Sequence, residues 1–279
     1  MTGPETLHRT PTHPWRWLPW LVMSQLAVAA VWWHAGWYVG LPMMVASHAL
    51  FMVPIFLPNS RFYAPVVSRL PGNAPRVWLT IDDGPSPETP AVLALLDRYQ
   101  ARATFFMVGE RAQARPDLVR EVLARGHDLG NHSHSHPQTR FWRLGPGTMS
   151  REISACQQAL TAAAGVPPRW YRSVVGMTNP FVAPSLKRLR LTRVGWSARG
   201  FDGVNCTPEG VVDRIRPDLK PGAIVLLHEG AAHGHNLAII EAVLQELQVR
   251  GLRAALPEDA PVPTAGAPSC PETPAPTAG

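Results

Sequence analysis

Two short stretches of the sequence combine residue types that bind metals with residue types that move protons. Asp82 and Asp83 stand side by side before a Gly-Pro pair, and adjacent carboxylates repel each other unless a cation or a proton lies between them. Further along the chain, His132 and His136 are four residues apart, so one helical turn would place both imidazoles on the same face. Neutral imidazole is the commonest protein metal ligand. We therefore expect Asp83, His132 and His136 to hold one metal ion, with Asp82 beside it as a base.

Two histidines and one carboxylate make a catalytic metal site rather than a structural one, because positions on the ion stay open for water and substrate. A bound metal lowers the pKa of its water towards neutrality, so a carboxylate such as Asp82 is then a sufficient base. The alternative is a solvated, histidine-rich loop together with an ordinary Asp-Gly-Pro turn. A turn needs only one of the two aspartates, so the pair favours the metal site.

A further histidine follows an apolar run. His228 comes directly after Ile224–Leu227 (IVLL), a run that is typical of a buried strand. A histidine at that position either bonds to the backbone within the core or lies at the mouth of a site, where it can protonate a leaving amine. Both interpretations stay open from these residues alone.

Such residues need a scaffold that brings distant segments together. Residues 76–256 alternate strand-like with helix-like segments, which predicts parallel strands with helices outside them. In barrels of this kind the chemistry lies at strand ends, and Asp82, Arg172, Trp196 and His228 all fall at predicted strand ends. The predicted strands are 77–81, 103–108, 169–172, 192–196 and 223–227, and the predicted helices are 88–99, 116–125, 149–164 and 237–250.

The amino-terminal part of the chain has a different composition. Residues 17–60 contain no Asp, Glu, Lys or Arg, a length that suits two membrane spans of ~20 residues better than one. Tryptophans near both ends of the first span would form aromatic belts. We predict spans at about 18–37 and 43–57, joined by a turn at residues 40–42. The alternatives are two buried helices in a soluble protein and a cleaved signal peptide, for which the apolar run is too long.

The remaining boundaries follow from composition, because the two ends of the chain hold little that can pack. The predicted organisation is a disordered segment at 1–14, a membrane region at 15–58, a linker at 59–75, a catalytic domain at 76–256 and a disordered Pro/Ala/Thr-rich tail at 257–279.

The apolar block predicts a membrane location, of the bacterial inner-membrane type, and the charges beside it leave the orientation open. Arg9 and Arg16 precede the block, and Arg61, Arg69 and Arg76 follow it. Under the positive-inside rule this pattern favours a hairpin with both ends in the cytoplasm. A single span with an interfacial second segment would instead place the main domain outside.

Net charge and cysteine content exclude other classes of protein. The net charge is +6, but the basic residues are scattered and accompany no aromatic-basic motif, so we predict no nucleic-acid partner. Cys156, Cys206 and Cys270 are far apart and lack CxxC spacing. They predict neither a disulfide framework nor a zinc–thiolate site.

Three of these stretches together resemble the motifs of the polysaccharide deacetylase family (carbohydrate esterase family 4, the NodB homology domain), over about residues 76–256. Residues 80–84 (TIDDG) are similar to the first family motif, with Ile in place of Phe. Residues 132–136 (HSHSH) are similar to the second and 226–228 (LLH) to the last. The resemblance implies a distorted, incomplete (β/α) barrel, in agreement with the strand–helix alternation.

The resemblance also implies roles for the site residues. Asp83, His132 and His136 would bind one divalent metal ion, most often zinc, while Asp82 would be the general base and His228 the general acid. The reaction would be hydrolysis of an N-acetyl or related acyl group from an amino sugar or glycan.

The third family motif, Arg-x-Pro-Tyr/Phe-Gly, is altered to RSVVG at residues 172–176. Arg172 is retained, and the resemblance implies that it pairs with Asp82 and keeps that carboxylate ionised and oriented. The backbone N–H of Val175 would hold the oxyanion of the reaction.

The fourth motif departs further, as WSARGFDG at residues 196–203. Trp196 is retained, but Arg199 stands where the family has the Asp that orients the acid histidine, and Gly203 stands where it has Trp. Asp202 is the candidate to orient His228 in place of that lost Asp.

An intact metal centre beside altered walls predicts an unusual substrate, and the membrane segment suggests a lipid-linked one. Two alternatives remain: a non-catalytic glycan-binding or scaffolding protein, and an amidase or esterase that acts on a non-sugar substrate. The complete set of base, acid and metal ligands favours an enzyme.

Overall fold

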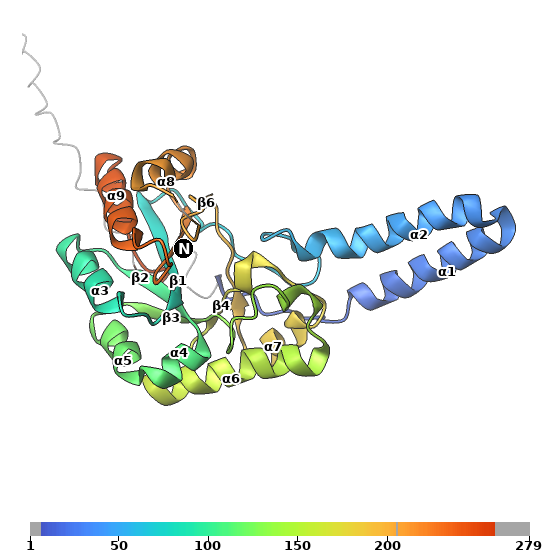
Figure 1. Cartoon of the computed structure of the whole chain (residues 1–279), viewed down its shortest axis with the longest axis horizontal. Coiled ribbons are helices and arrows are strands. Elements are labelled where there is room, and N and C mark those ends of the chain that lie inside the picture. Colours follow the sequence, from blue (N-terminus) through green and yellow to red (C-terminus); the bar gives the residue numbers. More distant parts are fainter. Residues whose placement is uncertain (1–6, 205, 260–279) are drawn as a thin grey trace, which may run out of the picture.

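The structure is a computed structural model that describes residues 7–204 and 206–259. Its main body is an α/β domain in which helices pack outside a curled parallel sheet, and a pair of helices extends away from this domain (Figure 1). The prediction of a distorted, incomplete (β/α) barrel is confirmed. Residues 1–6 and 260–279 of the two predicted disordered ends, and Cys270, lie outside the described residues.

The sheet has the strand order β5-β4-β3-β2-β1-β7-β6, and β8 pairs with the start of β1. All of these strand pairs are parallel, so the carboxyl ends of the strands gather along one edge. The strands are β1 Arg76–Gly84, β2 Ala103–Met107, β3 Asp128–Asn131, β4 Trp170–Tyr171, β5 Thr192–Arg193, β6 Ala198–Arg199, β7 Ile224–His228 and β8 Arg253–Ala254.

The helices of this domain begin and end at residues with clear local preferences. Pro116 opens one helix, where its missing N–H has no cost, and Gly165 ends another at a left-handed φ of 76°. The side chain of Thr207 caps a third by accepting a hydrogen bond from the Gly210 N–H at 3.2 Å. The helices are α3 Thr89–Arg98, α4 Gly109–Ala114, α5 Pro116–Ala124, α6 Pro146–Ala164, α7 Val182–Leu189, α8 Pro208–Ile215 and α9 Asn236–Val249, with short 3₁₀ turns η3 Phe141–Arg143, η4 Val174–Gly176 and η5 Arg216–Asp218.

Strand β1 is the centre of the sheet and is buried on both faces. Val77, Leu79 and Ile81 pack into the main core under the helices, while Trp78 packs on the opposite, concave face against Trp170 with a ring separation of 4.9 Å. Burial on both faces explains why the strand is a continuous apolar run rather than an alternating one. At its carboxyl end β1 carries Asp82 and Asp83.

The apolar block near the amino terminus forms helices α1 Trp17–Ala35 and α2 Trp37–Met52, and α2 continues into the 3₁₀ turn η2 Val53–Ile55. The turn between them is at Gly36, which has a φ of 74°, and not at residues 40–42 as predicted. Glycine adopts this positive φ at little cost, so Gly36 makes the reversal. Pro42 lies inside α2.

Most side chains of α1 and α2 are exposed and apolar. Polar contacts between the two helices are confined to one place, where Gln25 Nε2 donates to Ser47 Oγ at 2.9 Å and Ser47 Oγ lies 3.1 Å from Ser24 Oγ. By length and composition, one described helix, Trp37–Ile55, could cross a membrane, with a mean hydropathy of 1.5.

The segment after the hairpin, predicted as part of a linker, is held firmly against the domain. Arg193, which is fully buried, donates to the carbonyls of Pro58 and Ser60 at 2.7 and 2.9 Å. Val67 pairs with Val194 in an isolated parallel bridge. These contacts fix the base of the hairpin relative to the sheet.

Residues just before the hairpin also contact the domain, where the sequence predicted a disordered segment. Leu7 is buried in the apolar cluster that contains Trp78 and Trp170, and the ring of His8 stacks on Trp170 at 4.9 Å. The sequence pattern missed this because the segment forms almost no regular secondary structure.

Candidate metal centre and active site

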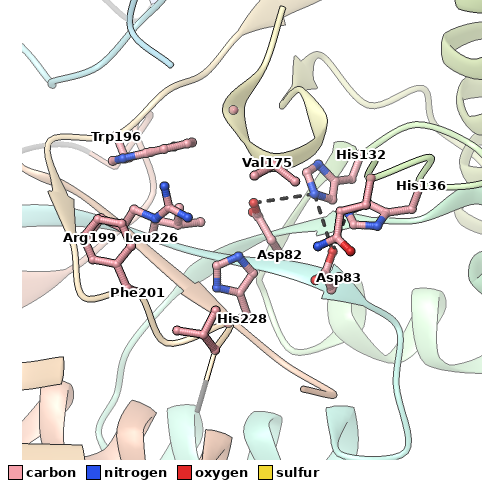
Figure 2. Close-up of a pocket in the computed structure, with 14 residues that line it drawn as sticks. Asp82, Asp83, His132, His136, Val175, Trp196, Arg199, Phe201, Leu226 and His228 are labelled. Carbon is pink, nitrogen blue, oxygen red and sulfur yellow. Dashed lines mark ion pairs between the residues drawn. The ribbon is translucent and has the colours of Figure 1, made fainter. Parts of the chain in front are cut away.

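The carboxyl ends of β1, β3 and β7 meet at one pocket, and the end of β4 lies behind it. Asp82 and Asp83 come from β1, His132 follows β3, Arg172 follows β4 and His228 ends β7. Figure 2 shows Asp83, His132 and His136 gathered on one side, Trp196, Arg199 and Phe201 on the opposite side, and Asp82 and His228 between them. The pocket is lined by Asp82, Asp83, His132, His136, Gln138, Val175, Gly176, Trp196, Arg199, Phe201, Gly203, Val204, Leu226 and His228.

A bulge in β1 lets Asp82 and Asp83 face the same pocket. Adjacent residues of a regular strand point to opposite faces. Here the register with β2 shifts between Asp82 and Gly84, and Asp83 adopts a left-handed φ of 71°. An extra residue of this kind re-aims a side chain, so both carboxylates reach one site from neighbouring positions.

The three predicted metal ligands lie together. One ligand atom from each of Asp83, His132 and His136 lies within 4.8 Å of the others. Nε2 of His136 is 3.1 Å and Nε2 of His132 is 3.5 Å from Asp83 Oδ1. That oxygen is buried and has no hydrogen bond of acceptable geometry among the described residues. Two imidazole nitrogens and an unsatisfied carboxylate oxygen fit a divalent cation.

The histidines reach this arrangement from a loop, so the prediction of a helical turn is wrong. Residues 132–136 contain no helix, and Ser133 and His136 have positive φ values of 68° and 51°. The carboxylate of Glu152 holds the loop by accepting from the backbone N–H groups of His134 and Ser135 at 3.0 and 2.9 Å. Two left-handed residues, rather than helical spacing, turn both imidazoles towards Asp83.

The surroundings set the protonation of these ligands. Burial lowers the pKa of His132, which favours the neutral imidazole that binds metals. Its Nδ1–H donates to the Arg172 carbonyl at 2.9 Å, leaving Nε2 free for an ion. Burial would raise the pKa of Asp83, but the approach of His136 and His132 holds it well below its usual value.

Asp82 is held by Arg172, as the motif comparison implied. Arg172 NH1 donates to Asp82 Oδ1 at 2.7 Å and to Thr80 Oγ1 at 2.8 Å, while NH2 donates to the Gly195 carbonyl at 2.9 Å. The guanidinium is fully buried and lies 4.2 Å from the centre of the Phe106 ring. Asp82 Oδ2 is therefore the oxygen left facing the pocket.

His228 is held by Asp202, the residue suggested in place of the missing Asp of the fourth motif. His228 Nδ1 lies 3.0 Å from Asp202 Oδ1, and the His228 backbone N–H donates to Asp202 Oδ2 at 2.7 Å. Burial lowers the pKa of His228, but Asp202 and the other nearby carboxylates outweigh it and raise the pKa to about 9. The alternative of a histidine bonded only to core backbone does not describe this side chain.

Val175 and Trp196 also line the pocket. Val175 is 42 % exposed and has a φ of 53°, a strained conformation for a β-branched residue. The adjacent Gly176 has no room for a side chain, because an added Cβ would lie 2.3 Å from the Trp196 ring and 2.9 Å from Pro58. Val175 lines the pocket, and its backbone N–H remains the predicted oxyanion donor.

Three further side chains hold segments around the site in place, and no sequence motif points to them. Asn59 donates through Nδ2 to the Trp196 carbonyl at 2.8 Å. Glu152 holds the histidine loop, as described above. Glu229 is 1 % exposed, and its Oε2 accepts from Ser86 Oγ and Thr89 Oγ1 at 2.7 and 2.5 Å. The partners of each side chain lie far from it in sequence, so local spacing could not reveal these contacts.

Comparison with known sequences places the domain among deacetylases. The family profile described as polysaccharide deacetylase matches residues 69–194. A chitooligosaccharide deacetylase of Bradyrhizobium sp. is 35 % identical over 190 residues, covering 65 % of this chain and 83 % of that protein. A peptidoglycan-N-acetylglucosamine deacetylase of Bacillus cereus is 34 % identical over 193 residues, covering 67 % of this chain and 89 % of that protein.

A solved structure supports the same relationship. The family 4 carbohydrate esterase from Streptomyces lividans, in complex with acetate, superposes with a TM-score of 0.60 at 34 % sequence identity. The match covers 66 % of this chain and 94 % of that chain. The shared region corresponds to the α/β domain, which makes up about that share of the sequence.

Proposed function

The chain belongs to the polysaccharide deacetylase family and is a deacetylase of that family, and from this membership we propose that it hydrolyses the N-acetyl group of an amino sugar within a glycan at a membrane. The observation that carries this proposal is the meeting of Asp82, Asp83, His132, His136 and His228 at one pocket. Relatives described as chitooligosaccharide and peptidoglycan-N-acetylglucosamine deacetylases support an amino-sugar substrate.

Asp83, His132 and His136 would hold one divalent metal ion, most often zinc in such a donor set. When bound, the ion polarises the acyl carbonyl and lowers the pKa of a water molecule. The histidines contribute Nε2, since Nδ1 of His132 is already used by the Arg172 carbonyl. The open side of this set faces the pocket, where the acyl group would enter.

Asp82 would take a proton from the attacking water through Oδ2. Its other oxygen accepts from Arg172 at 2.7 Å, and this charge-assisted bond fixes the carboxylate plane. A base must be ionised and within hydrogen-bond reach of the proton that it takes. Arg172 therefore acts by positioning Asp82, as it is buried behind the carboxylate and does not line the pocket.

His228 would give a proton to the leaving amine through Nε2, because Nδ1 faces Asp202. Water then supplies the hydroxyl of the released acetate, and the amine leaves with the proton from His228. The backbone N–H of Val175 would stabilise the oxyanion, and Trp196 would form part of the wall against which the sugar lies.

For the whole chain we propose a membrane region at 15–58 with spans near α1 and α2, followed by a catalytic domain at 76–256. The exposed apolar surface of the hairpin supports the membrane region, and an inner membrane of bacterial type fits the composition. A lipid-linked glycan would bring the substrate to the same surface.

The test uses the full chain purified in detergent. Acetate release from acetylated chitooligosaccharides and from peptidoglycan fragments is measured beside metal content. Asp82→Asn should retain the metal and lose turnover by at least about 100-fold, since general-base catalysis contributes roughly 10²–10⁴-fold. The exposed Asp218→Asn is the matched control.

Metal-loaded protein that releases no acetate from any acetylated amino sugar would refute the proposal. Near-normal turnover by Asp82→Asn would refute the assignment of the base alone.

A further inference from the structure

Arg199 is the one pocket side chain whose full charge has no partner among the described residues. The acids around it are already engaged: Asp82 pairs with Arg172 at 2.7 Å, and Asp202 pairs with His228 at 3.0 Å. Asp83 faces the two metal-binding histidines. No described carboxylate lies within ion-pair distance of Arg199, and its Nε is buried without a hydrogen bond.

Two aromatic rings hold this guanidinium at the pocket wall. Its central carbon lies 5.1 Å from the centre of the Trp196 ring and 4.5 Å from that of Phe201. Such contacts stabilise a cation and remove it from bulk water. Burial lowers the pKa of Arg199, but a guanidinium remains charged in proteins. A partly desolvated cation without a counter-ion is unfavourable unless a ligand supplies the opposite charge.

The position of Arg199 fits a second attachment point for a substrate. Arg199 pairs in the sheet with Leu226, two residues before His228. Figure 2 shows the group of Trp196, Arg199 and Phe201 across the pocket from Asp83, His132 and His136, with Asp82 and His228 between. A molecule whose acetamide lies at the metal ligands would therefore extend its sugar towards Arg199.

We propose that Arg199 is a specificity residue that binds an anionic group of the substrate, so that the preferred substrate is an acetylated amino sugar bearing a carboxylate or a phosphate. This rests on the proposed function. The planar guanidinium can donate two parallel hydrogen bonds to either anion, and the stacked rings fix the plane in which it does so.

The experiment compares matched substrates on the full chain with metal bound. One is a neutral N-acetylglucosamine oligomer, the second carries a lactyl carboxylate on the acetylated sugar, and the third carries a phosphate on it. The variants are Arg199→Gln, which keeps a planar neutral group, and the exposed Arg120→Gln, which removes the same charge away from the pocket.

The wild type should have a higher kcat/KM for one or both charged substrates than for the neutral one. Arg199→Gln should lower kcat/KM for the charged substrate by about 10- to 100-fold, mainly through KM, because a hydrogen bond to a charged group is lost. It should change the value for the neutral substrate by less than about twofold, and Arg120→Gln should change neither. The substrate with the larger ratio identifies the carboxylate or the phosphate as the anion.

Equal losses on neutral and charged substrates, or no preference in the wild type, would overturn the proposal. Equilibrium binding of the same three sugars, measured by calorimetry in the Asp82→Asn background, separates the two ideas. If Arg199→Gln abolishes a charge preference in binding, while the protein with Asp82 intact releases no acetate from any of the three sugars, the anion site is supported and the deacetylation is refuted. Acetate release without any charge preference would do the opposite.

Discussion

The carboxylate of Asp202 holds His228 at two points, the ring Nδ1 at 3.0 Å and the backbone N–H at 2.7 Å. The two contacts fix both the rotation of the imidazole and the nitrogen that faces the pocket. They also raise the pKa of His228 to about 9 against the opposing effect of burial. At neutral pH the ring is therefore protonated, as the proposed role of general acid requires.

This relationship predicts the alkaline limit of activity. The proton of His228 is lost as the pH rises through about 9, so kcat/KM should fall there. In Asp202→Asn the largest raising effect is lost, while burial and the smaller effects of Asp82 and Asp83 remain, so the alkaline limb should move to lower pH and activity at pH 7 should drop by about tenfold or more. The pH profile of kcat/KM measures both effects.

An unshifted alkaline limb in Asp202→Asn would contradict this account of His228. The pair also contributes to stability: because the folded-state pKa is above the unfolded value of 6.5, the contribution is complete below pH 6.5 and is lost as the pH rises through about 9.

Replacing a metal ligand should weaken zinc binding, whereas replacing another histidine of the same loop should not. Addition of zinc to the metal-free protein should raise the melting temperature of the wild type, since a ligand at 100 times its Kd stabilises by about 2.7 kcal/mol. His132→Ala should lose most of this shift. His134→Gln should keep it, because His134 does not line the pocket. Differential scanning calorimetry with zinc and with a chelator provides the measurement, and an equal response of both variants would argue against the ligand assignment.

Glu229 predicts a second pH effect, on stability alone. Burial raises the pKa of this carboxyl group from 4.5 to about 7, despite hydrogen bonds from Thr89 and Ser86. The folded-state pKa is raised, so the protonated side chain stabilises the fold below pH 4.5, and this contribution is lost as the pH rises through about 7.

The amide in Glu229→Gln cannot ionise and should therefore keep a higher melting temperature than the wild type at pH 8, with little difference at pH 5. The exposed Glu209→Gln is the control. A melting temperature below that of the wild type at pH 8 would show that Glu229 is ionised in the fold. Melting curves between pH 4.5 and 8.5 give the comparison.

Asn59 connects the base of the hairpin to the pocket wall. Its side chain donates to the Trp196 carbonyl at 2.8 Å and lies 3.4 Å from the Trp196 nitrogen. Asn59→Ala should cost about 1–3 kcal/mol of unfolding free energy, since the buried backbone groups lose their partner. It should also lower kcat/KM several-fold because the wall loosens. The exposed Asn73→Ala should do neither, and urea unfolding with acetate-release kinetics checks both.

The catalytic stretches could be found in the sequence because each is local. The paired aspartates, the histidine loop and His228 each sit within or directly after one short segment, and parallel strands bring such segments to one edge. What spacing could not show is how Asp83 turns: the bulge at the end of β1 depends on its register with β2, a contact between chain segments. The prediction of a helical turn for His132 and His136 was wrong for the same reason, because spacing does not show how the loop is held by other segments.

The walls of the site were less predictable, because their residues act through tertiary contacts. Strand β6 is two residues long, which is too short to show a periodic pattern of apolar residues. It nevertheless carries Arg199 into the pocket. The stacking of that side chain on Trp196 and Phe201 depends on how a loop folds back. Likewise, composition made residues 59–75 look like a linker, while the buried Arg193 binds the carbonyls of Pro58 and Ser60.

The contacts of Pro58, Asn59 and Ser60 with the sheet have a consequence for how the enzyme would search for its substrate. A catalytic domain on a long flexible tether tumbles freely and samples many heights and directions above its anchor. Here no flexible tether is present, because Asn59 is hydrogen-bonded to Trp196 of the pocket wall and the Pro58 carbonyl accepts from Arg193 of the sheet. With the hairpin in a bilayer, the pocket would keep a fixed distance from the membrane and a fixed orientation. Diffusion in the plane of the membrane would then deliver glycans to it.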